Sequence, residues 1–244
     1  MGQTLATALR QLFNGVSNGA KGAFDALVAR DCYLCGCPMG RERGAVCAAC
    51  AQVLPRHDGP ACPRCALPTA RGECCGRCLR QPPAFDTTHA VFDYAFPLDV
   101  LVQALKYHHR LALAALFARE LGALAEAEVD VVVPMPLHVR RLRERGFNQA
   151  VEIARPLARA AGVALELAEV VRVRDTAPQA RLERAARQAN MHGAFACRRR
   201  FDGLRIAVVD DVMTTGATLD ALARCLKASG AAAVHNFVVA RTLW

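Results

Sequence analysis

The chain has 244 residues, 53% of them hydrophobic, and a formal net charge of +9. This composition is typical of a globular protein with one large domain, or one medium domain and a small module. It contains no apolar run near the ~18 residues that a membrane-spanning helix needs, and no basic start followed by an apolar segment of the secretory kind. We therefore expect a cytoplasmic protein without a membrane span. Its charge suits an anionic ligand or nucleic acid, although a compositional preference for Arg would give the same value.

The pattern of residues predicts three parts. Residues 1–31 form a short helical lead, because Leu5, Leu9 and Leu12 recur at helical spacing. Residues 32–80 are rich in Cys, Gly and Pro and poor in large apolar side chains, so they cannot build a core alone. Residues 85–244 alternate strands with helices, which indicates an α/β domain with a mostly parallel sheet. The expected strands are 88–94, 129–133, 169–173, 205–209 and 233–239. The expected helices are one or two over 98–124, one over 148–161 and one over 218–228.

Ten of the twelve cysteines lie between Cys32 and Cys78. Eight of them form two sets of paired C-x2-C turns, the arrangement that closes a tetrahedral, structural zinc site. Disulfides and iron–sulfur ligation are the alternatives, but the C-x2-C spacing favours about two zinc ions. Spacing leaves open whether each metal takes consecutive or interleaved pairs. The candidate ligands are Cys32, Cys35, Cys47 and Cys50 in the first set and Cys62, Cys65, Cys75 and Cys78 in the second.

Two acids, two threonines and a glycine follow the apolar run that ends at Val209. Ligands bind at the carboxyl ends of strands in open α/β sheets, and a helix N-terminus attracts phosphate. Asp210 and Asp211 are therefore placed to accept from ribose hydroxyls or to order Mg²⁺. The alternative is an ordinary strand–helix turn capped by an acidic side chain, but such a turn does not require both acids together with the threonines and the glycine. The candidate ligand residues are Val209, Asp210, Asp211, Val212, Met213, Thr214, Thr215, Gly216, Ala217 and Thr218.

This run resembles the phosphoribosyl pyrophosphate (PRPP) loop of type I phosphoribosyltransferases. Further motifs make the resemblance to the ComF family more specific, and together they extend from Cys32 to Arg241. The motifs are 133–138, the Arg-rich 140–150, the Thr176-Ala177-Pro178-Gln179 run with Leu182, Arg187, Asn190 and Phe195, the Lys106-Tyr107 pair and the cysteine pairs. The chain departs from the family pattern at Cys37 and Glu183.

The resemblance implies a type I phosphoribosyltransferase-like parallel sheet flanked by helices, with an N-terminal four-cysteine zinc-ribbon module. It implies PRPP binding with Mg²⁺, with Asp210 and Asp211 as catalytic residues. It also implies a pyrophosphate loop and a mobile flap, formed by Pro134, Met135, Pro136, Leu137, His138, Arg181 and Arg187. The family's role in natural transformation implies single-stranded DNA and competence proteins as partners.

Two functional hypotheses remain open from the sequence. In the first, the chain is a phosphoribosyltransferase that transfers the ribosyl 5-phosphate of PRPP to an acceptor that the sequence does not specify. In the second, the PRPP site regulates a non-catalytic module that binds single-stranded DNA through the arginine-rich surface and the zinc ribbons. Detecting turnover of PRPP separates the two.

Overall fold

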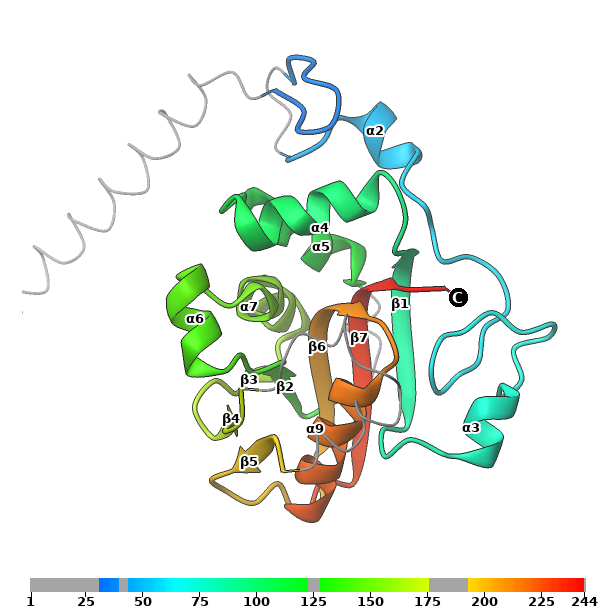
Figure 1. Ribbon diagram of the computed structural model, residues 1–244, viewed down its shortest axis with the longest axis vertical. Coiled ribbons are helices and arrows are strands. Elements are labelled where there is room, and N and C mark those ends of the chain that lie inside the picture. Colours follow the sequence, from blue (N-terminus) through cyan, green and yellow to red (C-terminus); the bar gives the residue numbers. More distant parts are fainter. Residues whose placement is uncertain (1–30, 40–43, 123–127, 176–192, 244) are drawn as a thin grey trace, which may run out of the picture. The chain divides into compact units, whose positions relative to one another are not determined.

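The computed structural model describes residues 31–39, 44–122, 128–175 and 193–243 (Figure 1). The chain divides into two compact units, residues 1–52 and 53–244. The predicted helical lead lies outside the described residues. The elements in chain order are α2 (Ala48–Gln52), α3 (Gly76–Arg80), β1 (Thr87–Asp93), α4 (Leu98–Tyr107), α5 (Ala112–Glu120), β2 (Val131–Pro134), α6 (Val139–Arg145), α7 (Gln149–Ala161), β3 (Ala164–Leu165), β4 (Val170–Arg172), β5 (Phe195–Cys197), β6 (Arg205–Met213), α9 (Ala217–Ala228) and β7 (Ala233–Arg241).

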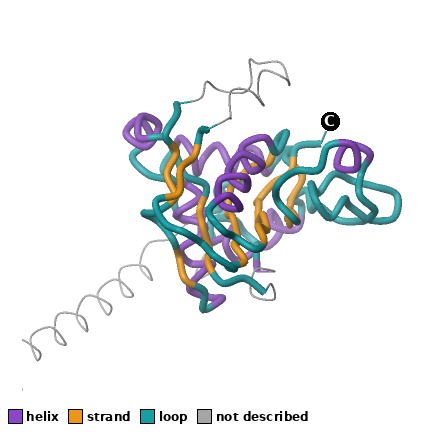
Figure 2. Tube along the Cα trace, turned by 90° about the horizontal axis from the view of Figure 1, so that it is seen from below, coloured by secondary structure: helices purple, strands orange, loops and turns teal. Residues whose placement is uncertain are grey.

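The second unit is built on a five-stranded sheet with the order β1-β7-β6-β2-β3. Its strand pairs are all parallel, and β2 is buried along its whole length. From β2 the chain passes through α7 to β3, and from β6 through α9 to β7, in opposite directions along the sheet. Because such crossovers are right-handed, α7 and α9 cover opposite faces, and helices flank both sides of the strands in Figure 2. The predicted parallel sheet flanked by helices is confirmed.

Three local features differ from the sequence-based expectation. Strand β6 runs on to Met213 instead of ending at Val209, because Asp210 and Val212 continue the pairing with β7. Strand β4 pairs antiparallel with β5 in a separate two-stranded sheet. Helix α6 was not predicted, since its arginine-rich sequence has no apolar stripe; it begins after His138 and ends at Gly146, whose φ is 80°.

The segment that precedes the second cysteine set lies along β1, the edge strand of the sheet. Arg56 forms an antiparallel bridge with Phe92, and the Thr88 amide donates to the Pro63 carbonyl at 3.0 Å. Backbone groups of an open edge strand need such partners. The second cysteine set is therefore attached to the sheet by main-chain hydrogen bonds.

The core of the second unit joins the sheet, α9 and the second cysteine set in one buried cluster. Phe85, Met213 and Leu222 belong to it together with Cys65 and Cys78. This shared burial gives the small cysteine ribbon the apolar contacts that it lacks by itself. Among the described residues, no helix combines the length and apolar character needed to cross a membrane.

Candidate functional site

The candidate site lies where β2 and β6 end side by side. These strands are neighbours, and the chain leaves them in opposite directions. Such a switch point opens a crevice at the carboxyl ends of the strands, where α/β proteins bind ligands. The Met135 amide donates to the Val209 carbonyl at 2.8 Å, which sets the predicted pyrophosphate loop beside the paired acids.

The two acids at the end of β6 are both buried, with Asp210 9% and Asp211 4% exposed. Lys106, from the last turn of α4, places its Nζ 2.8 Å from Asp211 Oδ2. Burial would lower the pKa of Lys106, but the Asp211 carboxylate outweighs it and the pKa is raised. Burial, followed by the charge of Asp211, raises the pKa of Asp210 to about 7, although Lys106 and Arg172 act in the opposite direction. Asp210 therefore changes charge near neutral pH.

The loop from β6 to α9 has the form of an anion site. Gly216 has a φ of +81°, and a Cβ there would lie 2.6 Å from Met213 Cε, so the position favours glycine on both counts. Thr215 Oγ1 accepts from the Ala217 amide at 3.3 Å. Among the residues that the structure describes, no acceptor meets the amides of 214–216. These amides precede the N-terminus of α9, where the helix dipole favours a phosphate.

The segment that follows β2 is held by the start of α7. The Asn148 side-chain amide donates to the Met135 carbonyl at 3.0 Å, while its Oδ1 accepts from the Ala150 amide and caps α7. His138 Nδ1 accepts from the Arg140 amide at 3.4 Å and so caps α6. The imidazole of His138 thus has a structural role at the start of a helix.

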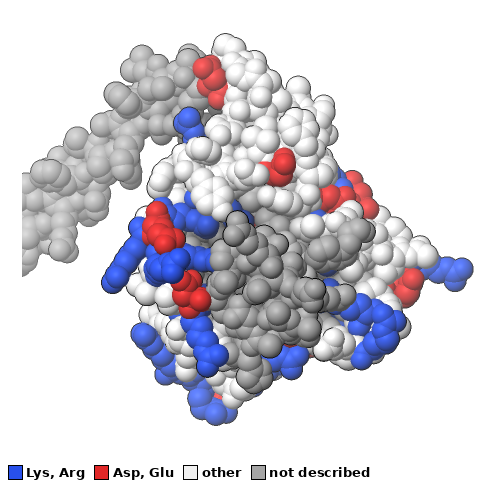
Figure 3. All heavy atoms as spheres, viewed as in Figure 1, with Lys and Arg blue, Asp and Glu red and all other residues white. Residues whose placement is uncertain are grey.

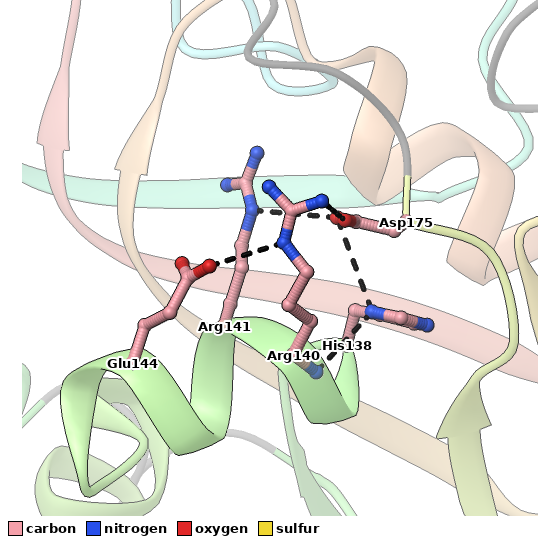
Figure 4. A network of polar contacts seen from close by, with 5 residues as sticks. All are labelled: His138, Arg140, Arg141, Glu144 and Asp175. Atoms are coloured by element: carbon pink, nitrogen blue, oxygen red, sulfur yellow. Dashed lines mark hydrogen bonds and ion pairs between the residues drawn. The ribbon is translucent and has the colours of Figure 1, made fainter.

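A polar network stands above this segment (Figure 4). Arg140 and Arg141 extend from α6 towards Asp175, whose carboxylate lies 3.0 Å from Arg140 Nη1 and 3.9 Å from both Arg141 Nε and His138 Nδ1. Glu144 also pairs with Arg140, at 3.0 Å. The network borders a cavity of about 570 Å³ whose lining includes Lys106, Tyr107 and Arg145. One acid therefore occupies the point where several cations converge.

Basic side chains are not confined to this cavity. Figure 3 shows Lys and Arg gathered over the side of the second unit that carries α6, β4 and β5, with acidic groups among them. Arg199 pairs with Glu166 at 3.1 Å and Arg200 with Asp202 at 2.6 Å, and the three residues 198–200 are exposed. These arginines are therefore exposed to solvent, whereas Asp210 and Asp211 are buried.

The eight predicted ligands form two clusters, each made of consecutive C-x2-C pairs. In each cluster the four Sγ atoms lie within 4.8 Å of one another. A tetrahedral ZnS₄ site with Zn–S bonds of ~2.3 Å needs sulfurs about 3.8 Å apart. The Sγ–Sγ distances are 3.8 Å for Cys35–Cys47 and 3.6 Å for Cys65–Cys75. Both clusters are consistent with structural zinc, the first in residues 32–50 and the second in the unit that holds the sheet.

Some predicted site residues cannot be placed, and some observed ones were not predicted. Arg181 and Arg187 of the expected flap lie outside the described residues. Sequence reasoning did not assign roles to Asp175 or to Arg172, whose charge lowers the pKa of Asp210. It also missed Arg77 and Arg241, which donate to the Thr215 and Thr214 carbonyls in the loop between β6 and α9. Their partners are distant in sequence, and no local motif signals them.

Comparisons with known proteins agree with this architecture. Residues 23–79 match the family model of the double zinc ribbon domain, and residues 147–242 match that of the phosphoribosyl transferase domain. The DNA utilization protein YhgH of Salmonella typhimurium (strain LT2) is 38% identical over 221 residues, which cover 87% of this chain and 97% of that protein. The competence protein ComFC of Bacillus subtilis (strain 168) is 26% identical over 249 residues, which cover 93% of this chain and 100% of that protein.

Among solved structures, the glutamine PRPP amidotransferase from B. subtilis complexed with ADP and GMP is 21% identical with a TM-score of 0.37. The match covers 56% of this chain and 30% of that chain, so the matched part spans less than a third of the amidotransferase chain. The two domain matches in this order, together with 38% identity over most of a curated relative, identify the family. The chain belongs to the ComF family, in which a double zinc ribbon domain precedes a phosphoribosyl transferase domain.

Proposed function

We propose that the second unit binds PRPP with Mg²⁺ and transfers its ribosyl 5-phosphate group to a nucleophilic acceptor. The observation that carries this proposal is the buried pair Asp210 and Asp211 beside a loop whose amides have no acceptor among the described residues. A ligand with a hydroxyl-bearing ring and a phosphate at one end fits this pair of features. The family and its transferase domain supply the same expectation.

Different residues bind different parts of the ligand. The loop from Thr214 to Thr218 takes the 5′-phosphate, because its amides and the start of α9 favour an anion. Asp210 and Asp211 take the ribose hydroxyls and help to hold Mg²⁺, which is bound in proteins through carboxylate oxygens. Their burial with one lysine fits a site that gains from a bound cation. When bound, Mg²⁺ neutralises the departing pyrophosphate.

On the pyrophosphate side, the segment from Pro134 to His138 forms the floor of the site. Arg140 and Arg141 of α6, the helix that follows this segment, extend towards Asp175 and would contact an anion bound in place of its carboxylate. Guanidinium groups bind phosphate oxygens through paired hydrogen bonds. Positioned cations of this kind stabilise negative charge as it develops on a leaving group.

Calorimetry with PRPP tests the proposal. We expect Mg²⁺-dependent binding that Asp210→Asn and Asp211→Asn weaken by on the order of 2–3 kcal/mol each, the scale for a charged hydrogen-bond partner lost in a buried site. Asp202→Asn is the matched control, because Asp202 is exposed and pairs only with Arg200 in the described contacts. Unchanged affinity in both site variants would remove the assigned role of the acids. Release of pyrophosphate with candidate acceptors then tests the transfer itself.

A second proposed function is binding of single-stranded DNA during DNA uptake. It is favoured by the names of the relatives, a DNA utilization protein and a competence protein, and by the exposed arginines of residues 198–200. Contacts to phosphates release counterions, so affinity should fall steeply with salt. Fluorescence anisotropy with labelled single strands measures how the logarithm of the affinity falls with the logarithm of the salt concentration. The triple variant with Arg198, Arg199 and Arg200 replaced by Ala should have a smaller slope than the wild type. An unchanged slope would exclude this surface.

Zinc occupancy completes the proposal. The two cysteine clusters predict about two zinc ions per chain by elemental analysis. Four thiolates leave no open coordination position, so the metals have a structural role. Cys37 Sγ lies 3.3 Å from Cys35 Sγ but outside the four-ligand set, so Cys37→Ser should keep both metals. A metal content near zero in folded protein would contradict the assignment.

A further inference from the structure

We propose that the second cysteine cluster sets the shape of the phosphate-binding loop through Arg241 and Arg77, so that metal binding in this cluster controls affinity for the phosphorylated ligand. The inference rests on the proposed function for the identity of that ligand. It concerns only the second cluster, which belongs to the unit that contains the sheet.

Arg241, the last residue of β7, is the central link. Its side chain is fully buried, at 0% exposure. Its Nε donates to the Cys65 carbonyl at 2.8 Å, and its Nη1 donates to the carbonyls of Met213 and Thr214 at 3.0 and 2.5 Å. One guanidinium thus joins the backbone of a cysteine ligand to the backbone that begins the phosphate loop.

Arg77 makes a second link from the same cluster. It lies between Cys75 and Cys78, and its Nη2 donates to the Thr215 carbonyl at 2.7 Å. Cys65, Arg77 and Cys78 share the lining of a small cavity with the loop residues Met213, Thr215, Gly216 and Ala217. The ribbon and the loop therefore face each other directly.

Peptide geometry turns these contacts into a statement about the ligand side of the loop. In a planar trans peptide the carbonyl of one residue and the amide N–H of the next point in opposite directions. The two arginines bind the consecutive carbonyls of Met213, Thr214 and Thr215 on the side of the ribbon. The amides of the next residues, 214–216, are thereby directed away from the ribbon, and these are the amides without an acceptor in the described part of the chain.

Charge explains why the metal should matter to this brace. A buried guanidinium requires hydrogen bonds and a counter-charge. Metal binding deprotonates the cysteines, so a zinc ion with four thiolates carries a net charge of about −2. A loaded cluster stabilises both arginines in the positions that hold the loop.

The first test removes one link without touching a cysteine. Arg77→Gln should weaken Mg²⁺-dependent PRPP binding by roughly tenfold, the scale of one charge-assisted hydrogen bond. It should also lower the ¹⁵N order parameters of the amides of 214–216 below the ~0.85 of a rigid backbone in ligand-free protein. Arg224→Gln is the matched control, because Arg224 lines the same cavity but pairs with the Asp220 side chain. Wild-type affinity and rigid amides in Arg77→Gln would overturn the inference.

The second test compares the last ligand of each cluster in the full chain. Cys78→Ser and Cys50→Ser should each reduce the zinc content from about two ions to about one. Only Cys78→Ser should loosen the loop amides and weaken PRPP binding, whereas equal effects of the two variants would overturn the inference. Should Cys78→Ser fail to fold, the Arg77→Gln result decides. Should wild-type protein fail to bind PRPP, the proposed function fails while the order parameters still decide whether the brace exists.

Discussion

The ion pair between Lys106 and Asp211 predicts a large and reciprocal cost when one partner is removed. The two charges are 2.8 Å apart, with side-chain exposures of 20% and 5%. Lys106→Met leaves a buried carboxylate without its cation. Removing one partner of a buried pair costs about 3–5 kcal/mol, and the remaining exposure of Lys106 places the expected loss of unfolding free energy near the lower end, about 3 kcal/mol.

The double variant Lys106→Met with Asp211→Asn separates the pair from its surroundings. With both charges gone, neither member of the pair is left without its partner, and replacing a buried ion pair by neutral groups is often nearly neutral. We therefore expect the double variant to lie within about 1 kcal/mol of the wild type. Urea unfolding at constant zinc and pH measures the four states of this cycle.

A second lysine provides the control. Lys227 also lies 2.8 Å from an acid, Asp86, but the two side chains are 33% and 39% exposed. Exposed pairs contribute about 0.2–1 kcal/mol, so Lys227→Met should cost less than the buried variant by a clear margin. Equal, small losses for Lys106→Met and Lys227→Met would refute the reasoning that burial makes the first pair important.

Three further predictions concern the ligand. Gly216→Ala should cost about 1–2 kcal/mol for its left-handed φ, plus displacement of Met213, and should reduce PRPP affinity more than stability in calorimetry and urea unfolding. The folded-state pKa of Asp210 is about 7, against an ordinary 3.8, so its ionisation lowers the free energy of unfolding as pH rises between these two values. Over the same range the affinity for Mg²⁺–PRPP should rise, because the charged carboxylate binds the metal. Asp210→Asn should remove this pH dependence of the affinity. Asp175→Asn should raise pyrophosphate affinity by up to about fivefold by freeing the α6 arginines, with exposed Glu144→Gln as the smaller-effect control, and a loss of affinity would contradict the competition.

The sequence was informative where a local pattern carries the structure. The apolar run before Asp210 and the glycine and threonines after it predict a strand, a turn and a helix within one short segment, and this unit is present. The C-x2-C spacing likewise predicts two four-cysteine clusters, since each turn brings two thiols together without any distant contact. Patterns of this kind need only the geometry of neighbouring residues.

Contacts between distant segments were not predictable from one sequence. Lys106 and Asp211 come from α4 and β6, and their pairing depends on how the helices pack over the sheet. Arg241 ends a strand whose sequence reads as apolar, so nothing marks its side chain as a buried link to the Cys65 carbonyl. Helix α6 was missed for another reason: it is held by its caps and surface ion pairs rather than by an apolar face.

The arrangement of charge suggests how one basic protein can keep two anionic ligands apart. Asp210 and Asp211 are buried at the end of β6, so a polyanion entering there without a metal would meet carboxylates first. In the proposed function, a small ligand that brings Mg²⁺ carries both signs of charge and would satisfy the acids together with the amides of 214–216. The arginines of 198–200 have no such selection, because they are exposed and the Asp202 partner of Arg200 is itself 62% exposed. In the proposed functions, depth and charge together would therefore direct the metal-bearing phosphorylated sugar to the crevice and a nucleic-acid backbone to the outer surface.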